Sequence, residues 1–246
     1  MTGTKASNPK YVICAPCFNE SEGIAQYVKE IRKHISDSLI IIVDDCSTDT
    51  TLEQLLILQK EVDNLIVLTN KVNVGHGMSS VRAWSEAIKF ESEGILSLDG
   101  DGQIAGVELA KALDYFKQSN IDVLECVRTQ RRDPWFRKLI TAALRLLVLV
   151  KSGKYPKDAN TPVRLYTKSI LSEIVRLIPE NILTPNLFIS IHLRKTKTKY
   201  AHFRIITRDR LGENRVGTTW NTRRSLMPSK KLLQFCAIAI KQIYKI

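Results

Sequence analysis

Two aspartates separated by one glycine, Asp99 and Asp101, follow the apolar run Ile95–Leu98, and Gln103 comes two residues later. Carboxylate and amide oxygens are the ligands that hard cations prefer, and such a cation usually keeps water and substrate phosphates as further ligands. The alternative for this segment alone is a polar turn with solvated acids. The spacing therefore points either to a cation site or to an ordinary Asp/Gly turn.

A second acidic segment, Asp44-Asp45-Cys46-Ser47-Thr48-Asp49, follows the apolar run Leu39–Val43. Carboxylates this close repel one another, so a fold keeps them together more readily when a nucleobase edge, ribose hydroxyls or backbone amides donate hydrogen bonds to them. The other interpretation is a helix N-terminus at which Ser47 and Asp49 are ordinary caps.

Cys14 and Cys17 have the spacing of a redox or zinc motif. A redox pair needs an exposed thiolate of low pKa, and a zinc site needs a second pair of ligands, which the sequence does not offer. The chain has 5 cysteines, and this odd, scattered set argues against a disulfide framework. We expect both residues to be buried and reduced, and Pro16, Asn19 and Glu20 to be better placed for chemistry.

The elements that position these residues are apolar runs that alternate with segments of helical period. The runs are Tyr11–Cys14, Leu39–Val43, Leu65–Leu68, Ile95–Leu98 and Ile121–Val127. This alternation predicts an α/β protein with a mainly parallel sheet and helices on both faces. Ligands of such sheets bind beyond the carboxyl ends of the strands. Since no Pro/Gly/Ser-rich linker interrupts the 246 residues, we expect a single domain.

Charge is divided unevenly along the chain. Residues 1–123 carry 11 Lys and Arg against 18 Asp and Glu, whereas residues 124–246 carry 26 against 7. The second half is therefore expected to meet an anion, and charge alone does not choose among nucleic acid, acidic lipid and phosphorylated substrates.

Four motifs, in this order and spacing, together resemble the family 2 glycosyltransferases of GT-A fold, which is Rossmann-like. They are Pro16-Cys17-Phe18-Asn19-Glu20, Val43-Asp44-Asp45-Cys46-Ser47-Thr48-Asp49, Asn73-Val74-Gly75 and Asp99-Gly100-Asp101. The resemblance implies a nucleotide-diphosphosugar donor, a UDP- or GDP-sugar. It implies that Mg²⁺ or Mn²⁺ is held on the diphosphate by Asp99, Asp101 and Gln103. The implied nucleotide-sugar ligands are Pro16, Asn19, Glu20, Asp44, Asp45, Asn73, Gly75 and Asp99.

The segment Asp158–Tyr166 is similar to the dolichol-phosphate mannose synthase-like branch, which transfers sugar to a polyprenyl phosphate. Arg128, Arg131 and Arg132 fall where that branch places ligands of the acceptor phosphate. The resemblance divides the chain into a nucleotide-sugar part at about 10–127, an acceptor part at about 128–228 and an amphipathic helix at 229–246.

A phosphate acceptor has a second pKa near 6 and is largely dianionic at neutral pH, so it attacks without a general base. Arg128, Arg131, Arg132 and Arg164 could hold it through forked hydrogen bonds, with Asp158 orienting an arginine. Were the acceptor a glycan hydroxyl, Asp158 would be the candidate base. A cation at Asp101 would stabilise the leaving diphosphate as a Lewis acid, and attack from the opposite face would invert the anomeric carbon.

Segments 135–151 and 230–246 have the pattern of cationic amphipathic helices. Such helices suit the headgroup plane of an acidic membrane, and the alternative is that they cover the protein's own core. With no run of 18 uncharged apolar residues and no signal-peptide pattern, we expect a cytoplasmic protein bound peripherally to the inner face of a membrane. A membrane-anchoring partner protein or a homo-oligomer could contribute to that attachment.

Two rival classes are weaker. A non-enzymatic nucleic-acid-binding protein would use the basic half, but it lacks interleaved aromatic residues and leaves the acidic strand ends unexplained. A nucleotidyltransferase wants a Gly-rich basic loop after the first strand, where this chain has Ala15–Glu20. We therefore expect no nucleic-acid partner.

Overall fold

The structure is a computed structural model that describes residues 9–129, 135–212 and 230–244. In the described residues, seven strands form one sheet in the order β3-β2-β1-β4-β6-β5-β7. The short strand β6 runs antiparallel to both neighbours, β4 and β5, and the other pairs are parallel. The mainly parallel α/β sheet predicted from the sequence is confirmed. The strands are β1 (Tyr11–Cys17), β2 (Ser38–Asp44), β3 (Leu65–Thr69), β4 (Gly94–Ser97), β5 (Val123–Thr129), β6 (Arg164–Tyr166) and β7 (Tyr200–Ile206).

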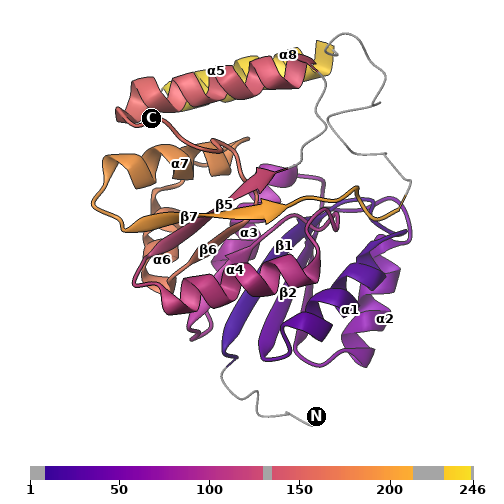
Figure 1. Cartoon of the computed structure of the whole chain (residues 1–246). Helices are drawn as coiled ribbons and strands as arrows, with labels where there is room; N and C mark the ends of the chain where they lie inside the picture. Colours follow the sequence, from indigo (N-terminus) through magenta and orange to yellow (C-terminus); the bar gives the residue numbers. More distant parts are fainter. Residues whose placement is uncertain (1–8, 130–134, 213–229, 245–246) are drawn as a thin grey trace.

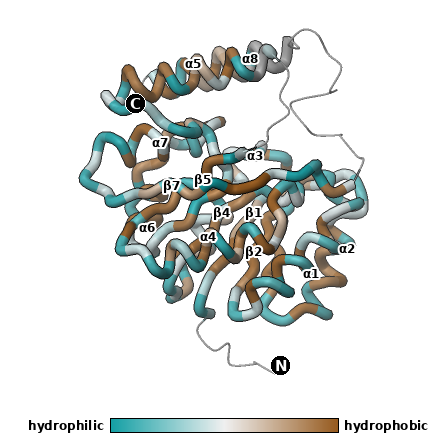
Figure 2. Tube along the Cα trace, in the orientation of Figure 1, coloured by the Kyte–Doolittle hydropathy of each residue, from teal (hydrophilic) through white to brown (hydrophobic). Residues whose placement is uncertain are grey.

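Helices cover both faces of the sheet (Figure 1). Successive side chains of a strand point to opposite faces, so Ile13 and Ala15 of β1 enter one apolar core while Val12 and Cys14 enter the other. The first core is closed by α1 (Ile24–His34), α2 (Thr51–Glu61) and α4 (Gly106–Gln118). The second is closed by α3 (His76–Ala87), α6 (Lys168–Leu177) and α7 (Pro185–Lys195). Figure 2 shows the resulting pattern, with hydrophobic strands at the centre and hydrophilic residues along much of the helices.

The five strands expected from apolar runs are all present, with ends that differ by up to three residues. The sequence did not indicate β6 and β7. Strand β6 has only 3 residues, and β7 is an edge strand whose residues are mostly half-buried, so neither makes a continuous apolar run.

Two further helices, α5 (Trp135–Ser152) and α8 (Lys230–Tyr244), lie side by side beyond α7 (Figure 1). Lys151 Nζ donates a hydrogen bond to the carbonyl oxygen of Tyr244 at 2.7 Å and lies over the ring of that residue. Each helix buries part of one face, with Val148 of α5 and Ile243 of α8 fully enclosed. Among the residues that the structure describes, no helix is both long and apolar enough to span a bilayer.

Candidate functional site at the carboxyl ends of the strands

The loops that follow β1 and β2 are joined by hydrogen bonds. The backbone amide of Asn19 donates to Ser47 Oγ at 3.0 Å, and its side-chain oxygen accepts from the amide of Thr48 at 2.8 Å. Asn19 adopts a positive φ of 54°, which asparagine tolerates better than most residues. The amide of Glu20 donates to Thr51 Oγ1 at 2.8 Å. These hydrogen bonds hold together the two loops that are predicted to bind the nucleotide-sugar.

Asp45 anchors the loop that precedes α3. Its carboxylate accepts hydrogen bonds from Asn70 Nδ2 at 2.8 Å, from the amide of Val74 at 2.9 Å and from the amide of Gly75 at 2.8 Å. Asn73 Nδ2 donates to the backbone oxygen of Asp45 at 3.0 Å. The predicted site residues Asp45, Asn73 and Gly75 are thus brought together by bonds to one another. The neighbouring Asp44 is fully buried and accepts from the amide of Ser47 at 3.1 Å.

Gly100 sets how closely the end of β4 approaches β1. Its amide donates to the carbonyl oxygen of Pro16 at 3.1 Å, and a Cβ at this position would lie 2.7 Å from that same oxygen. Only glycine permits this approach without a shift of the backbone. The contact places Asp99 and Asp101 beside the loop that carries Glu20.

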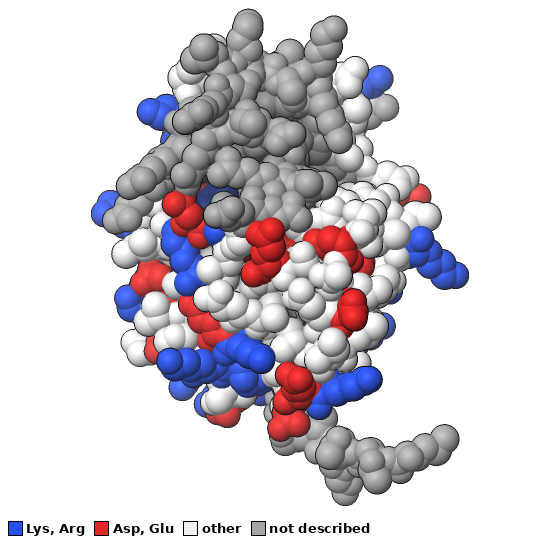
Figure 3. All heavy atoms as spheres, turned by 90° about the vertical axis from the view of Figure 1, so that its right-hand side faces the viewer, with Lys and Arg blue, Asp and Glu red and all other residues white. Residues whose placement is uncertain are grey.

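The carboxyl groups of Glu20, Asp99 and Asp101 influence one another's pKa values. Burial, together with the charges of Asp101 and Asp99, outweighs the opposing effect of Arg210 and raises the pKa of Glu20 to about 7. Burial, followed by the charge of Asp99, raises the pKa of Asp101 to about 6. On the face shown in Figure 3, acidic side chains gather across the middle while lysines and arginines lie mainly toward the edges. Negative charge is therefore concentrated where the strands end.

His76, at the start of α3, faces Asp99. Its Nε2 lies 2.8 Å from Asp99 Oδ1. The adjacent Asp99 carboxylate raises the pKa of His76 against an opposing effect of partial desolvation. The pKa of Asp99 is lowered overall because His76 outweighs the effect of burial. The pair is thus an ion pair in character, and sequence reasoning missed it.

The oxygen donors of this edge fit a divalent cation of the hard type. Asp99 and Asp101 are close enough for one charge to raise the pKa of the other, which is a repulsion that a bound cation would relieve. Within the described part of the chain, no group of three or more His, Cys, Asp and Glu side chains could hold a metal ion. Mg²⁺ commonly keeps water and substrate phosphates as further ligands beside one or two carboxylates. The side chain of the third predicted ligand, Gln103, is exposed at the same turn.

Residues 207–212, which follow β7, pack against the turn that carries Asp101 and Gln103. The backbone amide of Arg208 donates to the carbonyl oxygen of Gln103 at 2.9 Å, and the backbone amide of Leu211 donates to the carbonyl oxygen of Asp101 at 3.2 Å. Arg210 Nε donates to Glu20 Oε2 at 2.9 Å. A Cβ on Gly102 would lie 2.7 Å from the Leu211 side chain, so the glycine makes room for it. The segment gives the acidic edge a basic neighbour that the sequence did not reveal.

The predicted acceptor residues Arg128 and Asp158 form a pair at the end of β5. Arg128 Nε donates to Asp158 Oδ2 at 2.9 Å, and Nη2 donates to Oδ1 at 3.3 Å. Asp158 is thus paired with an arginine, as its expected role of orienting one requires. Arg128 also lies near enough to Asp99 to lower the pKa of that carboxyl. Arg131 and Arg132 lie outside the described residues.

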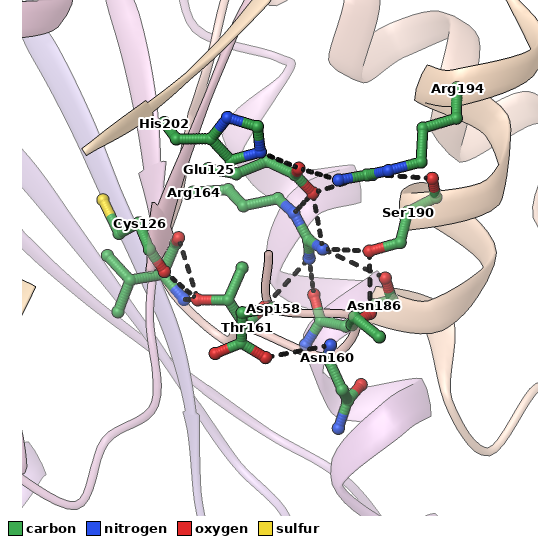
Figure 4. A network of polar contacts seen from close by, with 12 residues as sticks. Glu125, Cys126, Asp158, Asn160, Thr161, Arg164, Asn186, Ser190, Arg194 and His202 are labelled. Carbon is green, nitrogen blue, oxygen red and sulfur yellow. Dashed lines mark hydrogen bonds and ion pairs between the residues drawn. The ribbon is translucent and has the colours of Figure 1, made fainter. Parts of the chain in front are cut away.

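Arg164 is placed differently from the expectation that it binds an acceptor phosphate. Its side chain has 0% exposure, and its guanidinium nitrogens donate to protein oxygens of Glu125, Thr161, Asn186 and Ser190 (Figure 4). Residues of this type are almost never fully buried unless they are paired. The guanidinium is therefore a support inside the protein and does not face a ligand.

Cys14 and Cys17 are buried and free, as expected. Burial raises the pKa of both thiols, and for Cys17 the nearby Asp44 adds to the effect. A thiol with a raised pKa is a poor nucleophile and a poor metal ligand. The redox and zinc interpretations of this pair are thus excluded by its surroundings.

Comparison with known proteins gives a family and a fold. The family model described as "Glycosyl transferase family 2" matches residues 12–177. Among curated proteins, the undecaprenyl-phosphate 4-deoxy-4-formamido-L-arabinose transferase of Pectobacterium atrosepticum is 28% identical over 170 residues, which cover 67% of this chain and 50% of that protein. The chain thus spans about half the length of this curated relative.

Two solved structures share the fold. Glucosyl-3-phosphoglycerate synthase from Mycobacterium tuberculosis, in complex with phosphoglyceric acid, has a TM-score of 0.66 and 14% identity, over 96% of this chain and 79% of that one. A mannosyltransferase from Pyrobaculum calidifontis, in complex with GDP-Man and Mn²⁺, has a TM-score of 0.61 and 17% identity, over 96% and 65%. At these identities the likeness establishes the fold alone.

Proposed function

The chain belongs to glycosyl transferase family 2, and from this membership we propose that it transfers a sugar from a nucleotide-diphosphosugar to a polyprenyl-phosphate lipid. Both the family and the GT-A type of fold were predicted from four short motifs, and both are confirmed. The donor, the acceptor, the metal and the site residues are the content of the proposal.

One observation carries the proposal: Ser97 of β4 and Glu125 of β5 both pair with Arg164 of β6, so Asp99 and Arg128, which follow them by two and three residues, lie at the same edge of the sheet. Asp99 belongs to the acidic edge expected to meet the donor diphosphate, and Arg128 to the part expected to meet the acceptor. A phosphate held by Arg128 would therefore lie beside the donor, as transfer between the two requires.

On the donor side, we assign the base and ribose to the joined loops after β1 and β2, with Pro16, Asn19, Glu20 and Asp44. Asp45, Asn73 and Gly75 would support these loops, because Asp45 accepts hydrogen bonds from the amides of Val74 and Gly75 and its backbone oxygen accepts one from Asn73. Asp99 and Asp101, with Gln103 beside them, would hold Mg²⁺ or Mn²⁺. When bound, the ion supplies Lewis-acid stabilisation of the negative charge on the departing diphosphate. Two fold neighbours, the mannosyltransferase and the synthase, were solved with Mn²⁺, which supports this class of ion.

On the acceptor side, a phosphate monoester explains the arginine better than a glycan hydroxyl does. Both carboxylate oxygens of Asp158 accept hydrogen bonds from Arg128, so Asp158 is occupied as an orienting group and is poorly placed to act as a base. A dianionic phosphate needs no base. The oxygen of the acceptor phosphate would attack the anomeric carbon from the face opposite the diphosphate, with inversion. The name of the curated relative, an undecaprenyl-phosphate transferase, supports a lipid phosphate.

A lipid acceptor also gives a role to the outer surface of α5 and α8. Leu139 and Val150 of α5 are 61% and 74% exposed, and Ile238 of α8 is 50% exposed. Exposed Lys138 and Lys241 belong to the same helices. We assign this α5–α8 surface to peripheral contact with an acidic bilayer, with the lysines toward lipid headgroups. The buried residues of the same helices also cover the core, so the proposal assigns only their outer surface to the bilayer.

The test is a transfer assay with Mn²⁺ and a panel of UDP-sugars and GDP-mannose. Detergent-solubilised polyprenyl phosphate is offered in one arm and free glycans in the other. The proposal expects radiolabelled sugar in the organic phase of the lipid arm alone. Product in the glycan arm alone would refute the lipid acceptor while leaving the donor chemistry standing.

A further inference from the structure

Three consecutive backbone carbonyls before β6 are each held by a side chain from elsewhere in the fold. They belong to residues 159–161, which directly follow Asp158. The bonds run from Ser190 Oγ to Ala159 O at 2.7 Å, from Arg128 Nη2 to Asn160 O at 3.1 Å and from Arg164 Nη1 to Thr161 O at 2.9 Å. An irregular segment with every carbonyl bonded in this way has little freedom to move.

Ser190 connects this segment to the buried guanidinium. Its hydroxyl accepts from Arg164 Nη2 at 2.7 Å while it donates to Ala159 (Figure 4). Arg164 is fixed in turn by Asn186, whose side-chain oxygen accepts from Nη1 at 2.7 Å. One end of α7 is thus fastened to the same segment that carries Asp158.

Glu125 of β5 supplies the compensating charge. It is 1% exposed and lies opposite Arg164 in the strand register. Its Oε1 accepts from Arg164 Nη2 at 3.2 Å, and its Oε2 accepts from Arg194 Nη2 at 2.7 Å. His202 Nε2 lies 3.4 Å from the same Oε2.

Stability alone explains such a cluster poorly. Burying charged groups costs solvation that their attraction often fails to recover, and apolar replacements of similar volume are commonly as stable. An apolar core of similar volume would lack the hydrogen bonds that the cluster donates to the carbonyl groups of residues 159–161. The cluster is therefore explained by geometry that it imposes on its neighbours.

We propose that Glu125, Arg164 and Ser190 are positioning residues of the acceptor site. Through residues 159–161 they fix Asp158, and through Asp158 they set the direction in which Arg128 presents its guanidinium. The inference rests on the proposed function, because it takes Arg128 to be the ligand of the acceptor phosphate. None of the three touches the acceptor itself.

Ser190→Ala is the variant for the test, because it removes one hydroxyl and leaves the buried charges paired. The probes are farnesyl phosphate in detergent micelles for the acceptor, and UDP and GDP with Mn²⁺ for the donor. Losing a bond of this kind should weaken farnesyl phosphate binding about three- to tenfold, and leave nucleotide binding within about twofold. Ser172→Ala is the matched control, since its hydroxyl bonds to Lys168 O within α6 at 2.8 Å. That control should leave the dissociation constants of farnesyl phosphate and of the nucleotides unchanged.

Arg128→Ala, alone and combined with Ser190→Ala, separates the two claims. If Ser190 acts through Arg128, the double variant should bind farnesyl phosphate within about twofold of Arg128→Ala alone. Equal weakening of both ligands by Ser190→Ala, or no weakening of either, would overturn the positioning role while the proposed function stands. Unchanged farnesyl phosphate binding by Arg128→Ala would instead refute the acceptor assignment itself, with the positioning role built on it.

Discussion

Arg210 and Glu20, which stand 190 positions apart in the chain, form an ion pair in which Arg210 Nε donates to Glu20 Oε2 at 2.9 Å. Their side chains are 15% and 8% exposed. The pair fastens the segment after β7 to the loop after β1, and so closes one side of the acidic edge.

Arg210→Ala should destabilise the protein, because it leaves the Glu20 carboxylate buried without its main partner. Loss of one member of a buried pair costs roughly 3 kcal/mol in the free energy of unfolding, which urea titration measures. Arg176→Ala, at an exposed position of α6, should change the same quantity by less than about 0.5 kcal/mol. Equal, small losses for the two variants would show that the pair adds nothing to stability.

Asp101→Ala should abolish sugar transfer and the Mn²⁺-dependent part of UDP or GDP binding, because it removes a predicted ligand of the cation. Calorimetric titration with and without Mn²⁺ measures the binding. Asp114→Ala, on the exposed side of α4, is the control for charge alone and should bind as the wild type does. Metal-dependent binding that survives in Asp101→Ala would remove this residue from the cation site.

Acid should weaken the protein in part through Glu125. Burial raises its pKa, but His202, Arg164 and Arg194 outweigh that effect and lower the pKa from 4.5 to about 2. Between these values the native state binds fewer protons than the unfolded state, so the contribution is complete above pH 4.5 and is lost as the pH falls toward 2. The shift corresponds to about 3 kcal/mol.

Urea unfolding of the wild type and Glu125→Gln at a series of pH values tests this. The stability difference between the two proteins should be largest near neutral pH and should shrink as the pH is lowered below the ordinary range of glutamate. A difference that stays constant with pH would mean that Glu125 is not held ionised by its partners.

Leu139→Asp with Val150→Asp should weaken binding to acidic vesicles, because both side chains are exposed on α5. Moving two large apolar side chains out of contact with lipid removes about 3 kcal/mol or more, which is over tenfold in affinity. Vesicle sedimentation measures this, and nucleotide binding should not change. Leu56→Asp with Ile57→Asp on α2, 45% and 49% exposed, is the matched control. Similar vesicle binding by both double variants would argue against the α5–α8 surface as the contact.

The part of the fold that contains β1, β2 and β4 could be predicted closely from the sequence. Strands β1, β2 and β4 are buried on both faces and therefore read as continuous apolar runs, after which Glu20, Asp44 and Asp99 stand out as polar. The sequence left open whether Asp45 accepts hydrogen bonds from a ligand or from backbone amides, because its donors, the amides of Val74 and Gly75, lie in a later loop.

The part around β5 and β6 was harder to predict, because its contacts join residues far apart in sequence. Arg164 was expected to hold the acceptor phosphate, whereas it is paired with Glu125, which lies 39 positions earlier. A signal did exist: Glu125 interrupts the apolar run Ile121–Val127, and an acid within a buried strand requires a cation nearby. His76 and Arg210 carried no comparable signal, because neither interrupts an apolar pattern.

The antiparallel direction of β6 determines which loop can change in length without disturbing the rest of the sheet. In a parallel sheet, the loop that enters a strand lies at the edge opposite to the loops that leave the neighbouring strands. Because β6 is antiparallel to β4 and β5, the loop that enters it, which contains Asp158, lies at the edge where β4 and β5 end. Insertions between Ser152 and Asp158 would thus change the loop beside Asp158 without disturbing the alignment of β1, β2 and β3. A single inverted strand lets one connection vary at the edge of the sheet that carries Asp99, while the parallel strands keep their places.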